Sequence, residues 1–298
     1  MSARGLVKKY TKQAKQLLDK GKLLEAREIY FKASQLDTND DNLWVKLGEI
    51  SSRLNHHQDS ETAFRRAIAI NSNAPGYYLE LGKTQVALKN FPAAEQNFKT
   101  YTTMCPDAEE GYQALASLMK HWGRMKEAEQ YYQRILALTP NDENTLLQWA
   151  NILQQMGEHE KAVTTYQRIL KLTPESLEAV QGLGTSYCAQ HKFDLAHQTF
   201  KQGLNLYPER EADYQCNLVN LYYESGDWEQ ALTHCNEALQ SNPKHTHARM
   251  QRAYICKRST NPILSRTQLI AIVSVFTFQG RSASTSSTLA ALGSSLKT

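Results

Sequence analysis

The 298-residue chain lacks the short motifs by which most catalytic sites are found in a sequence. It has no glycine-rich phosphate loop, no GxSxG nucleophile turn and no HExxH zinc helix. We therefore expect no catalysis by this chain and no cofactor. The histidines have no partners at ligand spacing, so we interpret His121, His159 and His245 as solvated surface residues.

Cysteine is also sparse. The five cysteines, at 105, 188, 216, 235 and 256, form no CxxC pair, and their odd number argues against a disulfide framework. A zinc site built from Cys216, Cys235, His234 or His245 is conceivable. Because free cysteine commonly serves as a small buried apolar residue, we predict no metal site.

Long apolar runs are missing as well. The most apolar stretch, Leu269 to Phe278, is half of the roughly 20 residues that span a bilayer. Near the N-terminus, Gly5-Leu6-Val7 is too short for the core of a signal peptide. We expect a soluble, cytoplasmic protein without a membrane span.

Acidic residues are absent from the last part of the chain. Residues 1–237 contain 26 Lys and Arg and all 30 Asp and Glu, whereas residues 238–298 contain 8 basic residues and no acid. A basic tail on a mildly acidic body is an asymmetry that demands an explanation. The tail is either a natural partner-binding or anchoring extension, or the product of a reading frame truncated or shifted after about residue 258. We expect no nucleic-acid partner.

What the chain does have is a period. Proline recurs at 106, 140, 174 and 208, a spacing of 34 residues that indicates stacked copies of one supersecondary unit. With proline as position 32, position 20 is nearly always Ala and position 24 nearly always aromatic. The position-24 residues are Tyr30, Phe64, Phe98, Tyr132, Tyr166, Phe200 and Cys235. Seven units in phase exclude a chance match.

One unit shows the physical basis of the pattern. In residues 143–176, apolar residues at spacings of three and four predict two amphipathic helices. Gly157 lies between them, where a tight turn favours positive φ, and Pro174 follows the second helix, which it cannot continue. A single hairpin of this size cannot bury its apolar face alone, so the units must stack.

The pattern of Trp or Tyr at 4, Leu-Gly at 7–8, Gly at 15, Ala at 20, Tyr or Phe at 24, Ala at 27 and Pro at 32 resembles the tetratricopeptide repeat. The resemblance implies an all-α fold, an α-solenoid in which helix-turn-helix hairpins form a right-handed superhelix. After a leader of residues 1–6, the repeats are expected at 7–40, 41–74, 75–108, 109–142, 143–176, 177–211 and 212–245. We expect a capping helix at 246–258 and an irregular or disordered basic Ser/Thr-rich tail at 259–298.

The same resemblance implies a concave groove lined by positions 2, 5, 6, 9, 12 and 13 of each first helix. The candidate peptide-binding residues are Lys12, Lys46, Gln113, Lys120, Gln148, Asn151, Gln155, Asn217 and Asn220. Side-chain amides can bond an extended peptide backbone whatever its side chains, so the expected partner is another protein or a peptide. The alternative is that these residues lie on ordinary solvent-exposed helix faces and bind nothing.

Two specialised sites of the family are missing. Around Asn217, the basic half of the clamp that grips chaperone C-terminal tails is absent, which argues against such tails as partners. Position 6 also lacks the asparagine ladder of arrays fused to O-linked sugar transferases. We predict a non-catalytic protein–protein interaction scaffold. The alternative is the N-terminal repeat part of a truncated or split transferase, of the sulfotransferase or O-linked glycosyltransferase type.

The second repeat departs most from the pattern. It has Asn55 at position 15, Ser60 at position 20 and Ser72 at position 32. Because the stability of a repeat array is a sum of local and neighbour terms, we predict that repeats one and two fray first.

Overall fold

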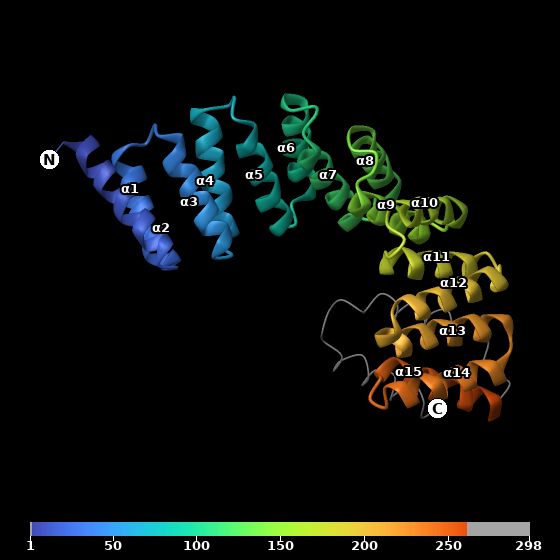
Figure 1. Ribbon diagram of the computed structural model, residues 1–298. Helices are drawn as coiled ribbons and strands as arrows, with labels where there is room; N and C mark the ends of the chain where they lie inside the picture. Colours follow the sequence, from blue (N-terminus) through green and yellow to red (C-terminus); the bar gives the residue numbers. More distant parts are fainter. Residues whose placement is uncertain (1, 261–298) are drawn as a thin grey trace, which may run out of the picture. The chain divides into compact units, whose positions relative to one another are not determined.

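The computed structural model describes residues 2–260, which form fifteen α-helices, one short 3-10 helix and no strand (Figure 1). The α-helices are α1 (Ala3–Asp19), α2 (Leu23–Leu36), α3 (Asp41–Arg53), α4 (His57–Ile70), α5 (Pro75–Ala87), α6 (Phe91–Met104), α7 (Glu109–His121), α8 (Met125–Leu138), α9 (Glu143–Gln155), α10 (His159–Leu172), α11 (Leu177–Ala189), α12 (Phe193–Leu206), α13 (Glu211–Ser225), α14 (Trp228–Ser241) and α15 (Thr246–Thr260). The 3-10 helix η1 (Pro208–Arg210) precedes α13. The all-α prediction is confirmed. Most of the expected tail, residues 261–298, lies outside the described residues.

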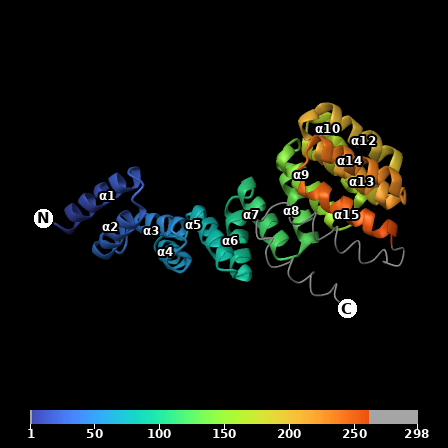
Figure 2. The ribbon, with the colours of Figure 1, turned by 90° about the horizontal axis from the view of Figure 1, so that it is seen from below.

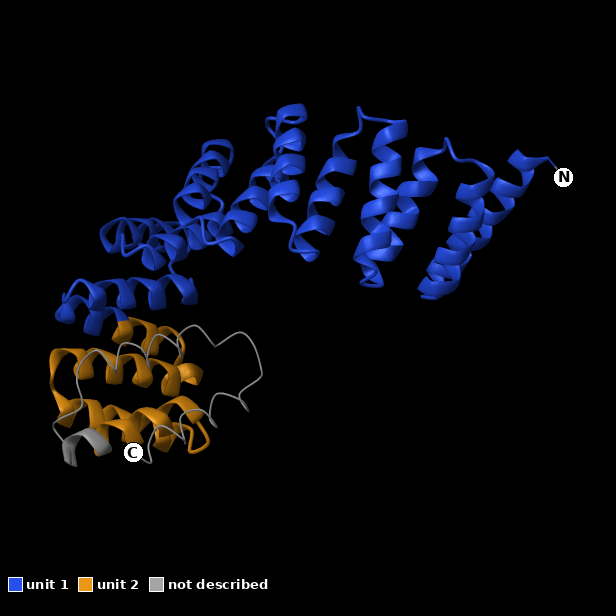
Figure 3. Cartoon of the chain, turned by 180° about the vertical axis from the view of Figure 1, so that it is seen from behind, with its two compact units in different colours: residues 1–199 blue, residues 200–298 orange. Residues whose placement is uncertain are grey.

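The chain divides into two compact units, Met1–Thr199 and Phe200–Thr298, and α12 crosses the division (Figure 3). In unit 1, each helix from α1 to α10 packs against the next helix in the chain (Figure 2). Alternate helices also touch, as α3 does with α5 and α9 with α11. In unit 2, α13, α14 and α15 contact one another. Within each unit the chain is a stack of helix pairs, whose first and second members we call A and B helices.

The turn inside each pair has a left-handed residue at position 15. Gly21, Gly123, Gly157 and Gly226 have φ between 72° and 86°, and Asn55, Lys89 and His191 have φ between 56° and 60°. The expectation for Gly157 is confirmed. The turn is therefore imposed by the helix pair itself, since residues that disfavour positive φ adopt it as well.

Small residues on the A helices make room for the aromatic ring at position 24. A Cβ atom on Gly48 would lie 2.9 Å from Phe64 Cζ, and one on Gly82 would lie 2.4 Å from Phe98 Cε1. Phe64 is completely buried and Phe98 nearly so. The alternation of small and large positions in the sequence thus reflects close packing of ring against backbone.

Each helix is amphipathic rather than apolar on all sides. In α9, Leu146, Ala150 and Leu153 are fully buried, whereas Asn144 and Gln155 are exposed. Among residues 2–260, no helix is both long enough and apolar enough to cross a membrane.

Candidate functional site

All nine predicted site residues lie on A helices. In unit 1, Lys12 is on α1, Lys46 on α3, Gln113 and Lys120 on α7, and Gln148, Asn151 and Gln155 on α9; in unit 2, Asn217 and Asn220 are on α13. Lys12 and the α9 amides belong to helices that are not neighbours in the stack. The chain therefore presents separate groups of candidates, which we describe helix by helix.

The structure brings two of the candidates on α7 and α9 into contact. Lys120 Nζ donates to Gln148 Oε1 at 3.4 Å, which links the two helices. The Gln113 amide donates to the Glu109 carboxylate one turn earlier on α7. Gln155 is exposed and, among the described residues, forms no hydrogen bond. Gln148 and Gln113 each retain amide groups that can bond another molecule.

Asn151 belongs to a tighter network that joins α9, α10 and α11. The Tyr166 hydroxyl lies 2.8 Å from both Asn151 Oδ1 and Gln154 Oε1. Gln154 Nε2 donates to the Gly182 carbonyl at 3.0 Å and to Ser186 Oγ at 2.8 Å. Because a phenol has one proton, Tyr166 donates to one of these two amide oxygens at a time. The amide nitrogen of Asn151, which forms no hydrogen bond among the described residues, is available to a ligand.

The sequence did not reveal the role of Tyr166, which looked like a core aromatic residue. Its ring is fully buried, and burial raises the pKa of its hydroxyl, which stays neutral. The hydroxyl reaches the A-helix side because Gly182 has no side chain; a Cβ there would lie 2.2 Å from Tyr166 Cζ. Glycine at position 6 of the sixth repeat was the available signal.

In unit 2, Asn220 connects α13 to α15. Gln251 Nε2 on α15 donates to Asn220 Oδ1 at 2.7 Å and to the Cys216 carbonyl at 3.1 Å. Asn217 is half-buried and, in the described part of the chain, forms no hydrogen bond. Of the two α13 candidates, Asn220 is engaged in holding helices together and Asn217 is not.

The interpretation of His245 as a solvated surface residue is wrong. Its Nε2 lies 3.1 Å from Asp213 Oδ1, and its Nδ1 accepts from the Ala248 N–H at 3.2 Å. Cys216 Sγ lies 3.6 Å from the same Nδ1. With Nδ1 accepting, the proton is on Nε2 and points to Asp213. His245 thus caps α15, because the turn before that helix places the ring over its first N–H groups.

Cys216, His245 and Asp213 lie in the order of the nucleophile, base and acid of a catalytic triad. Cys216 is nevertheless not activated as a nucleophile. Cys216 is almost completely buried, and burial, with Cys235 and Asp213 nearby, raises the pKa of its thiol to about 12. At neutral pH the sulfur is a protonated thiol and a poor nucleophile. The arrangement stabilises the helix start.

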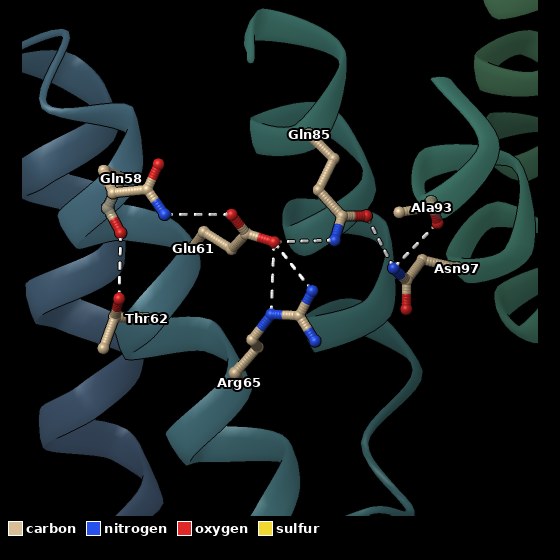
Figure 4. A network of polar contacts seen from close by, with 7 residues as sticks. All are labelled: Gln58, Glu61, Thr62, Arg65, Gln85, Ala93 and Asn97. Atoms are coloured by element: carbon tan, nitrogen blue, oxygen red, sulfur yellow. Dashed lines mark hydrogen bonds and ion pairs between the residues drawn. The ribbon is translucent and has the colours of Figure 1, made fainter. Parts of the chain in front are cut away.

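A second polar network in unit 1 joins α4, α5 and α6 (Figure 4). Gln85 Nε2 donates to Glu61 Oε1 at 3.0 Å, and Asn97 Nδ2 donates to Gln85 Oε1 at 2.7 Å. Arg65 donates to the same Glu61 oxygen at 2.8 Å. Burial raises the pKa of Glu61, but the hydrogen bonds from Gln85 and Arg65 outweigh it, so the pKa lies below its ordinary value. Gln85 is 1% exposed, so this network serves helix packing rather than binding.

Residues 2–260 contain no group of three or more His, Cys, Asp or Glu side chains placed to hold a metal ion. None of the five cysteines, all of which lie within residues 2–260, forms a disulfide.

Comparison with known proteins identifies the class of helical repeat. Three models of the tetratricopeptide repeat match the chain, at residues 142–209, at 182–246 and 216–257, and at 41–73 and 109–142. The chain belongs to the tetratricopeptide repeat family. No curated protein matches it.

Solved structures of similar fold are helical repeat proteins of low identity. The C-terminal part of a repeat protein from Cytophaga hutchinsonii is 16% identical and has a TM-score of 0.69, over 81% of this chain and 98% of that chain. A tetratricopeptide repeat protein from Parabacteroides merdae is 15% identical with a TM-score of 0.58, over 85% and 99%. The MamA protein is 21% identical with a TM-score of 0.52, over 57% and 93%. These similarities concern the fold. Tetratricopeptide repeat proteins generally bind proteins or peptides, and this chain is an interaction scaffold of that class.

Proposed function

We propose that the chain is a non-catalytic scaffold that binds a peptide or a partner protein on the A-helix side of α7 and α9. The observation that supports this is the group of amides Gln113, Gln148, Asn151 and Gln155, which lie on two successive A helices joined by the Lys120–Gln148 bond. Each amide offers a donor and an acceptor of the kind that an extended backbone needs.

Part of this surface is held in place before any partner arrives. Tyr166 restrains Asn151, and Lys120 restrains Gln148. Side chains that are already ordered lose less entropy on binding, which favours affinity. Each hydrogen bond exchanged with water contributes about 0.5–1.5 kcal/mol, so we expect dissociation constants near the micromolar range. Uncharged contacts of this kind should depend weakly on salt.

The test uses partners captured from a lysate and then purified. Changing Gln148 and Asn151 together to Ala should weaken their binding by roughly tenfold. The matched control changes Gln96 and Gln133 to Ala, two exposed amides on the B helices α6 and α8. Equal affinity of the wild-type and Gln148/Asn151 proteins would refute the proposed surface.

The remaining predictions rest on sequence alone. Lys46, Asn217 and Asn220 stay candidate contacts outside the α7–α9 surface, and the cytoplasmic location stays a prediction. The transferase alternative also stays open: translation of the DNA beyond codon 258 in all three frames would reveal a catalytic domain if the chain is part of such an enzyme.

A further inference from the structure

Helix α1 has four cations on one side. At 100° of rotation per residue, Arg4, Lys8, Lys12 and Lys15 fall within about 80° of one another around the helix axis. All four are exposed. We call these residues the α1 stripe. Asp19 lies on the same side and ends it.

The α1 stripe lacks the acidic partners that lysines have on two other A helices of unit 1. Within residues 2–260, none of its four cations forms an ion pair. On α3, by contrast, Lys46 Nζ lies 2.7 Å from Glu49, and on α5, Lys83 Nζ lies 2.7 Å from Glu80. Among the described residues, Lys46 and Lys83 are thus neutralised and Arg53 at the end of α3 is not, whereas all four cations of the α1 stripe lack an ion pair.

This arrangement works against the stability of α1. The first turn contains no acid and includes Arg4, although the positive end of the helix dipole favours negative charge there. Arg4, Lys8 and Lys12 are also spaced by four residues, where like charges repel. A local arrangement that opposes helix formation without a compensating contact in the chain is typical of a binding surface.

We propose that the α1 stripe binds an acidic, extended peptide segment of a partner protein. The stripe is about 16 Å long at 1.5 Å per residue. An extended peptide of about five residues covers that length at 3.3 Å per residue, and three or four carboxylates along it match the four cations. The proposal goes beyond the α7–α9 amide surface and does not depend on it.

Other anionic occupants fit less well. The positive region is concentrated on one helix, because the lysines of α3 and α5 are paired and, in the described part of the chain, Arg53 is the one cation of those two helices without an ion pair. A nucleic-acid duplex or an anionic membrane would extend across those helices. The apolar side of α1 is used for packing, with Val7 and Ala14 buried, so it is not available to enter a bilayer. The chain's own tail is excluded, since residues 238–298 contain no acid.

The test measures binding to the full chain by fluorescence anisotropy. The probe is a fluorescein-labelled peptide of alternating Glu and Ser with both ends blocked, and the reference is the same peptide with Gln in place of Glu. The stripe variant is Lys8→Glu with Lys12→Glu. Its control, Lys9→Glu with Lys20→Glu, makes the same charge change at exposed lysines of this segment outside the stripe. Circular dichroism verifies that both variants fold.

We expect the Glu peptide to bind and the Gln peptide not to bind. The stripe variant should lose at least about tenfold in affinity, and the control less than about threefold. Raising the ionic strength from about 0.05 M to about 0.3 M should weaken binding by roughly tenfold, unlike binding at the amide surface. The stripe variant should in turn bind the corresponding Lys and Ser peptide.

Three results would overturn the proposal. The first is no binding of the Glu peptide at low salt. The second is an equal loss in the control variant, which would indicate general attraction to net charge. The third is stripe-dependent binding of a single-stranded oligonucleotide or of phosphatidylserine vesicles that is tighter than that of the peptide. None of these results would contradict the proposed α7–α9 amide surface, because its test uses different variants and expects a different salt dependence.

Discussion

Two pairs of repeats have helices of the same lengths but differ in the polarity of their buried residues. The first pair is repeats two and three, formed by α3–α6, and the second is repeats four and five, formed by α7–α10. Position 11 of the unit is Ser51 and Gln85 in the first pair of repeats, and Met119 and Leu153 in the second. All four side chains are at most 1% exposed. The same backbone thus accepts a polar or an apolar residue at a fully buried position, on the condition that the polar residue is hydrogen-bonded.

The polar repeats meet that condition through partners in neighbouring helices. Arg27 Nε donates to Ser51 Oγ at 3.1 Å, and Gln85 bonds Glu61 and Asn97. The Ser60 hydroxyl donates to the Gly48 carbonyl at 2.9 Å, which explains how serine replaces alanine at position 20. Bonds of this kind replace bonds to water, so their net contribution is smaller than that of apolar burial.

The two pairs of repeats also differ at the left-handed turn. Asn55 and Lys89 hold positive φ in repeats two and three, where Gly123 and Gly157 do so in repeats four and five. Lysine resists this conformation because its Cβ approaches the following carbonyl oxygen. On both grounds we expect repeats two and three to be less stable than repeats four and five.

The largest effect should come from removing the centre of the polar network. Gln85→Leu removes one partner of the Asn97 amide, which keeps only the Ala93 carbonyl, and one partner of the Glu61 carboxylate, which keeps Arg65. We expect a loss of about 1–3 kcal/mol in unfolding free energy, measured by urea titration followed by circular dichroism. Met119→Leu, the volume-conserving control one repeat later, should cost less than about 1.5 kcal/mol. If Gln85→Leu instead stabilised the protein, the polar network would not contribute to the stability of the fold.

Native-state hydrogen exchange tests the regional comparison directly. We expect amides in repeats one and two to exchange at least roughly tenfold faster than those of residues 109–208, a difference of about 1.4 kcal/mol in opening free energy. The reason is repeat two, whose interior contains the buried Ser51 and Ser60 and whose turn holds Asn55 at positive φ, and repeat one packs on repeat two. Slower opening in repeats one and two would refute the predicted order.

Relief of turn strain should have a smaller effect of opposite sign. Lys89→Gly should stabilise the protein by roughly 0.5–1 kcal/mol, because glycine adopts φ of 59° without a Cβ clash. Gly157→Ala is the mirror change and should destabilise the protein by about 1 kcal/mol. Thermal melts of the two variants measure both. A destabilising Lys89→Gly change would mean that the lysine side chain contributes more than its backbone costs.

The smallest effect concerns pH. The pKa of Glu61 is lowered from its ordinary value of 4.5, so the folded state gains stability from its ionised form. That gain is complete above the ordinary value and is lost as the pH falls through the lower value of the folded state. Glu61→Gln should therefore flatten the decline of the urea midpoint between about pH 5 and about pH 3. Asp41 and Glu95, whose pKa values are also lowered, keep the rest of the decline. An unchanged pH profile in Glu61→Gln would contradict this assignment.

Much of the fold followed from sequence, and much less of the site did. Seven units in phase implied helix pairs, and Gly157 implied a left-handed turn, because periodicity and φ preference are local properties. The hydrogen bonds of Asn151, Gln148 and Asn220 were not predictable. They depend on which side chains of neighbouring helices come within 3.5 Å, and the repeat phase does not specify rotamers.

The sequence by itself determined the architecture of this protein, because each unit repeats a pattern of small, large and turn residues that only stacked helix pairs satisfy. It also determined that the cations of α1 share one side, which follows from helical spacing alone. The tertiary structure decided which polar groups are already engaged. Tyr166 reaches Asn151 because Gly182 lacks a side chain, and His245 caps α15 because Asp213 of the preceding A helix holds its ring. Such contacts form between residues 15 to 32 positions apart, where close packing rather than local preference selects the partner.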